Sequence, residues 1–403
     1  MPTTATPGWP AVVSLTLGLF AVVTTEILPI GLLTSIGADF TVSDGTAGLM
    51  MTLPGFLAAA SAPLVTAATA RTDRRPVLAA LLLTLTVACL LAAAATDFRL
   101  ILVSRALVGI TIGGFWSVGS GLAERLVGPS SAGRATAVIF SAVPLGSVLG
   151  VPAGTFVGDL AGWRTAFAAM GALTAAVLVM LLLTVPPLPP VQATRPTVLK
   201  GALGRRPVHL ALLLTFLVVL AHFGTYTYVT PFLEQVTHAD DAVITVCLLL
   251  YGAAGILGNF LAGARVHRRP RLVLGLAAGL IAAASLLLPA LGRSTAGALA
   301  LLIVWGVAYG AVPVASQTWF TRALPHAPEA ASVLFTSSFQ ATFSAGALAG
   351  GAVLDRTSPA AVMTAGGCVA ALTVLAVTAA PGAGRPRRAT PTTPRQGEPA
   401  APA

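Results

Sequence analysis

The sequence predicts an all-α polytopic membrane protein with twelve transmembrane helices in two six-helix bundles. The first observation is composition: 56% of the 403 residues are hydrophobic and 9% are charged, whereas soluble domains carry about 25% charged residues. The second is the apolar runs, which have the length of about 20 residues that a membrane helix needs and lack the alternation of barrel strands. The third is a charged, proline-rich break near the middle of the chain.

Charged residues, prolines and glycines separate the apolar runs. The predicted spans are 9–32, 47–69, 77–96, 100–121, 135–157, 165–185, 208–232, 242–263, 272–291, 296–318, 331–353 and 358–380. The longest connection, 186–207, is predicted to be a cytoplasmic linker. It divides an N-terminal bundle at 1–185 from a C-terminal bundle at 208–380, and a disordered cytoplasmic tail follows at 381–403.

The basic residues predict the orientation. With the N-terminus inside, most of the 23 lysines and arginines fall in inner loops or the tail, and most acids fall outside. Cytoplasmic loops carry this excess of positive charge. We therefore expect a multi-pass protein of the inner (plasma) membrane, embedded in the lipid bilayer, with both termini cytoplasmic. The net charge of +10 does not indicate a nucleic-acid partner, because the basic residues lie in short loops between apolar runs.

The two halves also resemble each other. Arg-Arg-Pro at 74–76 precedes a leucine-rich span, and the same tripeptide recurs at 268–270 before another. The segment at 135–150 is similar to the segment at 331–350, which lies at a similar offset. Two repeated six-span halves are typical of secondary transporters.

Two charged residues lie inside spans. Glu26 is the only acid well inside an apolar run, and a carboxylate at that depth is costly unless it is paired, protonated or in contact with a wet cavity. It is either a hydrogen-bonded structural group or, as we favour, the group that exchanges a proton during transport. Arg105 either reaches the outer interface or is a buried cation that pairs with Glu26 or tunes its proton. Both are candidate proton-coupling residues.

The fifth span predicts a closely packed, pliant helix. Gly146, Gly150 and Gly154 are spaced four apart, which opens a groove on one face, and Pro152 removes a backbone donor. We expect a mobile interface here. Gly109 and Gly113 in the fourth span have the same spacing, and for them close packing alone is the better interpretation.

Spans seven and eleven supply candidates for a substrate cavity. His222 and Tyr226 share a face of span seven, and Tyr228 follows. Span eleven carries Gln340 on a polar face and Phe339 in a stripe of phenylalanines. Polar groups in a membrane are expected to face inward. The Phe stripe is either core packing or a ligand platform, and His222 is either a structural histidine or a proton relay.

The usual signatures of enzymes are missing from the sequence. There is no G-x-x-x-x-G-K-[ST], H-E-x-x-H or G-x-S-x-G motif and no Cys/His cluster. Its three cysteines share no metal-ligand or disulfide spacing. We expect no catalytic residues, metal or cofactor, and therefore no enzyme.

Several motifs resemble the major facilitator superfamily, and within it the twelve-span drug:proton antiporters near the chloramphenicol-resistance and arabinose-efflux-like permeases. "GSVLGVPAGTFVGDLAGWRTAF" looks like their fifth-span antiporter motif. "TTEILPIGLL" resembles a first-span signature that places the membrane acid on Glu26, and "RALVGITIGGFW" resembles the fourth-span motif that begins at Arg105. "FGTYTYVTPFL" resembles the seventh-span pattern. The loop "TAATARTDRRPVL" departs from the family's gating pattern but keeps Arg74 and Arg75.

This resemblance implies the major facilitator fold, with alternating access between two rocking bundles. We expect a monomer that exports small amphipathic compounds, such as drugs or antibiotics, in exchange for protons. The alternative is an exporter or facilitator of sugars or another small metabolite. Sugar sites need many hydrogen-bonding groups, and the predicted cavity is rich in Phe, Leu and Ala instead.

Overall fold

The computed structural model describes residues 8–69, 71–119, 122–127, 131–189, 201–266, 268–325 and 327–380. Within these ranges the chain forms helices and no strand. The predicted tail at 381–403 and residues 190–200 of the predicted linker lie outside the described residues.

Twelve long helices form the described part of the fold. The N-terminal half contains α1 (Trp9–Ile27), α4 (Leu49–Ala68), α5 (Arg74–Ala93), α6 (Phe98–Gly119), α8 (Ala132–Ala161) and α9 (Trp163–Thr184). The C-terminal half contains α11 (Arg206–Tyr226), α13 (Asp241–Val266), α14 (Pro270–Leu291), α15 (Thr295–Ala323), α16 (Pro328–Leu354) and α17 (Pro359–Ala379). Among the described residues, eleven helices are long and apolar enough to cross a membrane, and α16 is the long helix that is not among them. The all-helical fold class is therefore confirmed.

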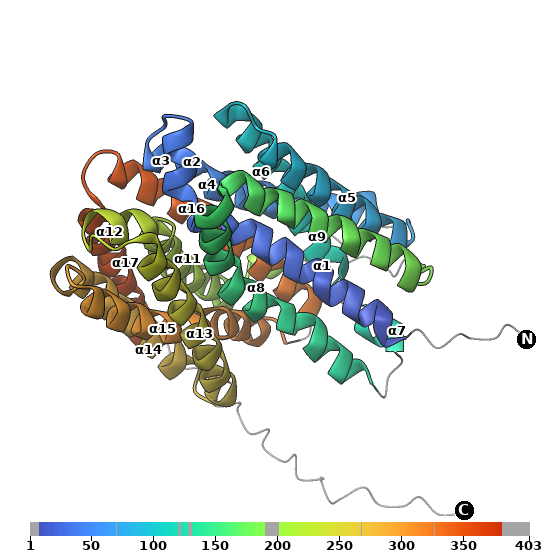
Figure 1. Ribbon diagram of the computed structural model, residues 1–403. Helices are drawn as coiled ribbons and strands as arrows, with labels where there is room; N and C mark the ends of the chain where they lie inside the picture. The colour runs from blue at the N-terminus through green and yellow to red at the C-terminus, as the bar shows by residue number, and fades with distance from the viewer. Residues whose placement is uncertain are drawn as a thin grey trace, which may run out of the picture.

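The two halves repeat one packing pattern, which Figure 1 lets the reader follow. In the N-terminal half α1 packs on α8, α4 on α6 and α5 on α9; in the C-terminal half α11 packs on α16, α13 on α15 and α14 on α17. The repeated Arg-Arg-Pro tripeptides occupy equivalent places, at the starts of α5 and α14. Each half is a six-helix bundle.

The first helix of each half breaks near a proline. α1 ends at Ile27 and continues as the short turn η1 (Leu28–Ile30), and α11 ends at Tyr226 before the short helix α12 (Val229–Gln235). Pro29 and Pro231 lack a backbone N–H, so the carbonyls four residues earlier, those of Thr25 and Thr227, lose their helical donor. The membrane-length helices run from Trp9 to Ile30 and from Arg206 to Tyr226, so the predicted span 9–32 agrees to within two residues and the predicted span 208–232 runs past the break after Tyr226.

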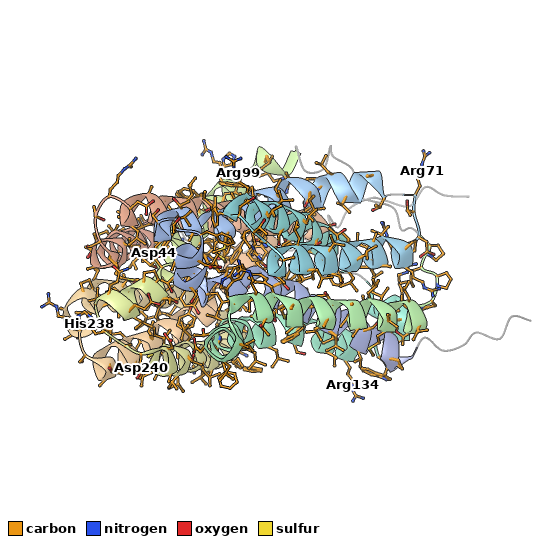
Figure 2. The ribbon with its side chains drawn as sticks, turned by 45° about the horizontal axis from the view of Figure 1, so that its top comes forward. Asp44, Arg71, Arg99, Arg134, His238 and Asp240 are labelled. Atoms are coloured by element: carbon orange, nitrogen blue, oxygen red, sulfur yellow. The ribbon has the colours of Figure 1, made fainter. Side chains whose placement is uncertain are left out.

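The two ends of the molecule differ in charge. We call the near side the end where α1 begins and α9 ends, and the far side the end that carries α2 (Leu33–Asp39), α3 (Asp44–Ala47) and α12. The short helix α7 (Ala123–Val127) lies on the near side. Figure 2 shows Arg71 and Arg134 toward one end and Asp44, His238 and Asp240 toward the other.

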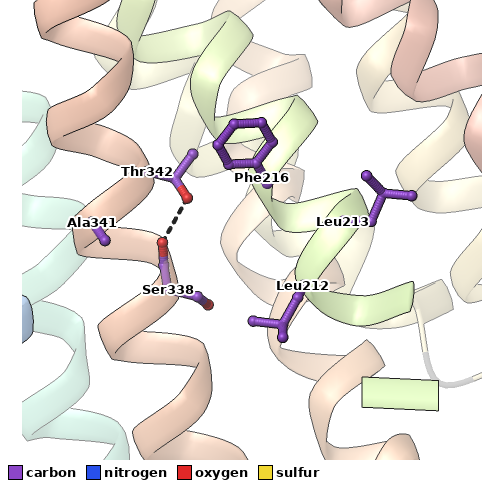
Figure 3. A pocket seen from close by; sticks show the side chains of 6 residues that line it. All are labelled: Leu212, Leu213, Phe216, Ser338, Ala341 and Thr342. Atoms are coloured by element: carbon purple, nitrogen blue, oxygen red, sulfur yellow. Dashed lines mark hydrogen bonds between the residues drawn. The ribbon is translucent and has the colours of Figure 1, made fainter. Parts of the chain in front are cut away.

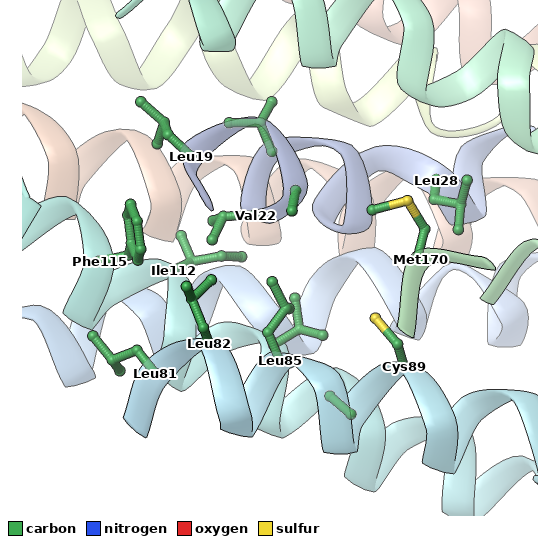
Figure 4. Close-up of a cluster of buried hydrophobic side chains, with 14 of the residues drawn as sticks. Leu19, Val22, Leu28, Leu81, Leu82, Leu85, Cys89, Ile112, Phe115 and Met170 are labelled. Carbon is green, nitrogen blue, oxygen red and sulfur yellow. The ribbon is translucent and has the colours of Figure 1, made fainter. Parts of the chain in front are cut away.

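Each half has its own apolar core. In the N-terminal half the core includes Leu82, Ile112 and Phe115, which Figure 4 shows between α1, α5 and α6. The second large cluster includes Trp305 and lies mostly in the C-terminal half, with Ile30, Met51 and Val151 added from the N-terminal half. Lipid tails are as apolar as these side chains, so close packing and hydrogen bonds between helices supply most of the association energy. A buried polar side chain in this environment needs a partner.

Candidate functional site between the two bundles

Glu26 lies where the two halves meet. It occupies the last turn of α1 and is 8% exposed. Its Oε1 accepts a hydrogen bond of 3.0 Å from Nε2 of Gln340, which lies on α16 in the other half and is 6% exposed. The sequence predicted these residues separately, as proton-coupling and substrate-cavity candidates, and the structure brings them into contact.

Arg105 is fully buried on α6 and binds backbone carbonyls. Its NH1 donates to Thr25 O at 2.7 Å, its NH2 to Glu26 O at 2.7 Å and its Nε to Met50 O at 2.9 Å. The guanidinium therefore does not reach the outer interface. The predicted ion pair between Arg105 and the Glu26 carboxylate does not form, and the guanidinium binds backbone carbonyls instead. Among the described residues, the ion pair within 4.0 Å is the one between Arg164 and Asp39.

Prolines explain why Arg105 binds two of these three carbonyls, those of Thr25 and Met50. In an α-helix the carbonyl of a residue accepts from the N–H four positions later. Four residues after Thr25 stands Pro29, and four after Met50 stands Pro54 inside α4. Proline has no N–H, so both carbonyls lack their helical donor, and the planar fork of the guanidinium supplies the replacement. Arg105 thus joins α1, α4 and α6 just beside Glu26.

His222 is enclosed by aromatic rings of its own half. Its Nδ1 accepts a hydrogen bond of 3.1 Å from Trp305 Nε1, and the Tyr309 ring stacks on it at a centroid distance of 3.5 Å. The rings of Tyr226 and Tyr251 are also parallel to it, at 5.2 and 6.4 Å. Because Nδ1 is an acceptor here, the imidazole is neutral. This geometry favours the structural interpretation of His222 over the proton relay.

The same cluster continues to the helix that carries Gln340. Phe223 contacts Phe343 at a ring distance of 3.9 Å and Phe339 at 6.1 Å, and both of these belong to α16. The sequence singled out His222, Tyr226 and Phe339 in this cluster. Nothing in the spacing singles out Trp305, Tyr309 and Tyr251, because they lie on α13 and α15 and reach His222 only in the folded bundle.

Tyr228 lies apart from this aromatic cluster. Its hydroxyl donates to Ala347 O at 2.6 Å, and its side chain is fully buried against Gly48 of the N-terminal half. The residue therefore belongs to the contact between the halves on the far side. No ring contact among the described residues joins it to His222.

Further hydrogen bonds join the halves on the far side. Thr230 donates to Ile30 O at 3.0 Å, and Thr34 donates to Glu234 at 2.8 Å. The remaining bonds surround α3: Ser43 Oγ to Asp355 at 2.9 Å, Gly45 N to Asp355 at 3.0 Å and Gln235 Nε2 to Asp44 at 3.2 Å. Together with Glu26–Gln340, these hydrogen bonds connect the two halves.

Exposure varies along α16, and Ala330 and Ala331 at its near-side start are buried. Residues 332–339 are all at least partly exposed, whereas Gln340, Thr342, Phe343 and Ser344 are buried. The near-side arginines of the predicted conformational motif bind within their own half: Arg74 NH1 donates to Thr69 O at 3.0 Å, and Arg75 donates to Leu182 O. They cover the carbonyl ends of α4 and α9.

The glycine face of α8 packs on α1. A Cβ at Gly146 would lie 3.0 Å from Val23, one at Gly150 would lie 3.1 Å from Ile27, and one at Gly154 would lie 2.6 Å from Leu28. Pro152 is buried on the same helix. The close approach that the spacing predicted is therefore present, and it is an approach within the N-terminal half. Mobility of this interface stays a prediction. Contact of α8 with the other half involves Val148 and Gly252 instead.

Gly109 and Gly113 pack against α4, where added Cβ atoms would meet the carbonyls of Pro54 and Ala58 at 2.4 and 2.5 Å. The packing interpretation of these two glycines is thus confirmed.

A shallow hollow of about 380 Å³ lies between α11 and α16. It is lined by Leu212, Leu213, Phe216, Ser338, Ala341 and Thr342 (Figure 3). It contains none of the predicted cavity residues.

Comparison with known proteins places these features in a family context. A model of the Major Facilitator Superfamily matches residues 15–347. The purine ribonucleoside efflux pump NepI of Salmonella enteritidis is 31% identical over 375 residues, covering 93% of this chain and 94% of the pump.

Two solved structures share the fold. A bacterial homologue of the human lysosomal transporter Spinster, in an inward-facing and unoccupied conformation, has a TM-score of 0.71 and 17% identity over 93% of this chain and 95% of its own. A mutant of the nucleoside transporter NupG has a TM-score of 0.72 and 14% identity over 91% of this chain and 99% of its own.

Proposed function

The chain belongs to the Major Facilitator Superfamily, and from that premise we propose that it is a proton-coupled exporter of small, planar amphipathic compounds, with purine ribonucleosides as the first class to test. At the coarser level it is a multi-pass secondary transporter of small molecules and not an enzyme. The predicted drug:proton branch and the inner-membrane location belong to this proposal.

The hydrogen bond between Glu26 and Gln340 is the observation that carries the proposal. It joins Glu26, the only buried acid among the described residues, to a side chain of the opposite half at 3.0 Å. A buried carboxylate in a membrane is retained where it serves an ion or substrate pathway. Because its partner is on the other half, a change in its protonation alters a contact that relative movement of the halves makes or breaks.

The substrate class is inferred from the side chains around this contact. Phe339 and the Phe223 ring next to it offer apolar faces on which a flat heterocycle can stack. Gln340 offers an amide that can recognise a polar edge. Ribonucleoside efflux is the activity named for the 31% identical relative, and a nucleoside has both the flat base and the polar edge. A free sugar has no flat aromatic ring to stack on these phenylalanines, which favours a nucleoside over a sugar.

The closed far side supports alternating access. The bonds near α2, α3 and α12 close that side, while residues 332–339 of α16 are partly exposed toward the near side. Each cycle would break these far-side bonds and close the near side. With the predicted orientation, the near side is the cytoplasmic one from which an exporter collects its substrate.

The test is transport by the purified chain in proteoliposomes. We expect an imposed pH gradient to drive uptake of radiolabelled inosine, and a protonophore to abolish it. Uptake that ignores the gradient would contradict proton coupling. Transport of an amphipathic cation such as ethidium, with no transport of inosine or adenosine, would overturn the nucleoside assignment in favour of general drug efflux.

A further inference from the structure

Gln340 has one partnered and one unpartnered end. Its Nε2 donates to Glu26, whereas its carbonyl oxygen Oε1 is buried and has no hydrogen-bond partner. Ser344, one turn further along the same face of α16, also has an unpartnered buried hydroxyl. A buried acceptor without a partner is costly, so such atoms in a native protein indicate a water, an ion or a ligand.

The orientation of this amide depends on the charge of Glu26. An ionised carboxylate can only accept hydrogen bonds, so the NH₂ end of Gln340 faces it and the oxygen is left for another donor. A protonated carboxyl group carries an O–H that can donate to the Gln340 oxygen. The amide then turns over, and the end free for another molecule becomes the NH₂ donor.

Few other charged or titratable groups face this pair. Arg105 of α6 donates a hydrogen bond to the Glu26 backbone carbonyl. Tyr309 of α15 and Cys89 of α5 lie nearby. His222 of α11 is hydrogen-bonded to Trp305. Cys89 contacts Thr25 through its sulfur at 3.8 Å. α4 contains no ionisable side chain, and neither do residues 135–158 of α8 or 330–354 of α16. Glu26 is thus the carboxyl group to which Gln340 responds.

We propose that Gln340 couples protonation to substrate affinity by reversal of its amide: it accepts a hydrogen bond from an N–H or O–H of the substrate while Glu26 is ionised, and loses that acceptor when Glu26 is protonated. The step moves one proton onto the Glu26 carboxylate and exchanges hydrogen bonds, with no other bond made or broken. Proton binding and substrate binding then oppose each other, as an exchanger requires. This inference rests on the proposed function and adds the residue that links its two ligands.

The first experiment measures inosine affinity of the purified full-length chain across a pH range. In the wild type we expect the Kd to rise as the pH falls through the titration of Glu26. In Gln340→Met, which keeps the length of the side chain and removes both polar ends, we expect affinity at high pH to fall about tenfold and its pH dependence to vanish. Glu26→Gln removes the titrating group, because its amide stays neutral at every pH, so the Kd of this variant should not vary with pH.

Gln317→Met is the matched control, because Gln317 is an exposed glutamine on the membrane helix α15. It should retain the wild-type affinity and pH dependence. The inference is overturned if either Gln340→Met or Glu26→Gln keeps the wild-type pH dependence of the affinity. A wild type whose inosine affinity does not vary with pH would also overturn it, while leaving the substrate class intact.

A second measurement is made without substrate, so it does not depend on whether the chain binds a nucleoside. Infrared difference spectra between high and low pH should show the carboxyl band of protonated Glu26 together with a shift of a glutamine side-chain carbonyl band. The glutamine shift should disappear in Gln340→Met and persist in Gln317→Met. A carboxyl band without the glutamine shift would refute amide reversal even if the chain bound no nucleoside, so the failure of this inference is separable from failure of the proposed substrate.

Discussion

The Glu26–Gln340 contact and the His222 cluster are both buried polar groups near the middle of the molecule, and they differ in where their partners lie. Glu26 is bonded to the opposite half. His222 is bonded to Trp305 and stacked on Tyr309, both within its own half. When the halves move relative to each other, the first set of contacts must change and the second can remain intact.

This difference separates two roles that look alike in the sequence. A titratable group can couple a proton to a conformational change only if the two conformations offer it different environments. Glu26 meets that condition because its partner belongs to the other bundle. His222 has its acceptor nitrogen occupied by an indole N–H and its faces covered by rings, so its environment is fixed by one bundle.

The largest expected effect comes from removing the titrating group of the interbundle contact. Glu26→Gln should reduce pH-driven uptake in proteoliposomes to background, because an amide of the same size cannot carry the proton. Binding of an uncharged substrate should persist in this variant. Full proton-coupled uptake by Glu26→Gln would show that Glu26 is structural and that another group, such as His222, carries the proton.

The second effect concerns the cation that supports the contact. Arg105→Lys keeps the charge but cannot reach Thr25 O, Glu26 O and Met50 O together. Each carbonyl left without a donor costs about 1–3 kcal/mol, so we expect a lower melting temperature and weaker transport at normal expression. A melting temperature and a transport rate equal to those of the wild type would show that the three hydrogen bonds contribute little to stability or transport.

The sequence predicts the fold better than it predicts the site. Long apolar runs and the repeated Arg-Arg-Pro tripeptide are local patterns, and they give the helix number and the two halves. The helix breaks were also readable, since Pro29 and Pro231 stand inside the predicted spans.

The contacts of the site could not be read in the same way. Glu26 and Gln340 are separated by 314 positions, and the helical pattern of each span says only that a face is polar. The carbonyls bound by Arg105 carry no side-chain signal, although the prolines four residues beyond Thr25 and Met50 do mark them as lacking a donor. Trp305 and Tyr309 were missed because aromatic residues in an apolar helix are ordinary core residues by sequence.

The third effect concerns the close packing of α8 against the C-terminal end of α1, which carries Glu26, and tests whether transport requires it. Gly154→Leu would place side-chain atoms where Leu28 lies, since even a Cβ comes within 2.6 Å of it. We expect insertion into the membrane with loss of most transport, measured by uptake and by surface expression. Gly263→Leu is the control, because a Cβ there meets nothing within 4 Å; equal transport by the two variants would contradict the role of this packing.

A smaller effect is expected within the aromatic cluster. His222→Phe leaves the Trp305 N–H without its acceptor, at a cost of about 1–3 kcal/mol in stability. The number of protons exchanged per substrate should stay unchanged, because the partners of His222 belong to its own bundle and relative movement of the halves leaves them in place. The measurement is substrate-induced proton release from the purified chain. A lower proton count in His222→Phe would show that the enclosed histidine also takes part in coupling.

The smallest expected effect concerns the closure of the far side, where Glu234 accepts from Thr34. Burial raises the pKa of Glu234, and the nearby carboxylates of Asp44 and Asp241 raise it further, while the Thr34 hydrogen bond opposes the shift. A carboxyl group whose pKa is higher in the closed state binds a proton more tightly there. Protonation therefore favours closure, and the ionised form favours opening.

Falling pH should therefore shift the population toward the closed far side, and rising pH should shift it toward opening. Spin labels on exposed far-side positions, introduced by Ala38→Cys and His238→Cys in a chain without its native cysteines, would report the distance between α2 and the segment after α12. We expect a modest increase in the short-distance population between about pH 8 and about pH 5. Glu234→Gln, which stays neutral at every pH, should remove this change while leaving proton-coupled uptake in place. If the pH response of the distance persists in Glu234→Gln, Glu234 does not control the far-side closure. The closure would then follow the protonation of Glu26.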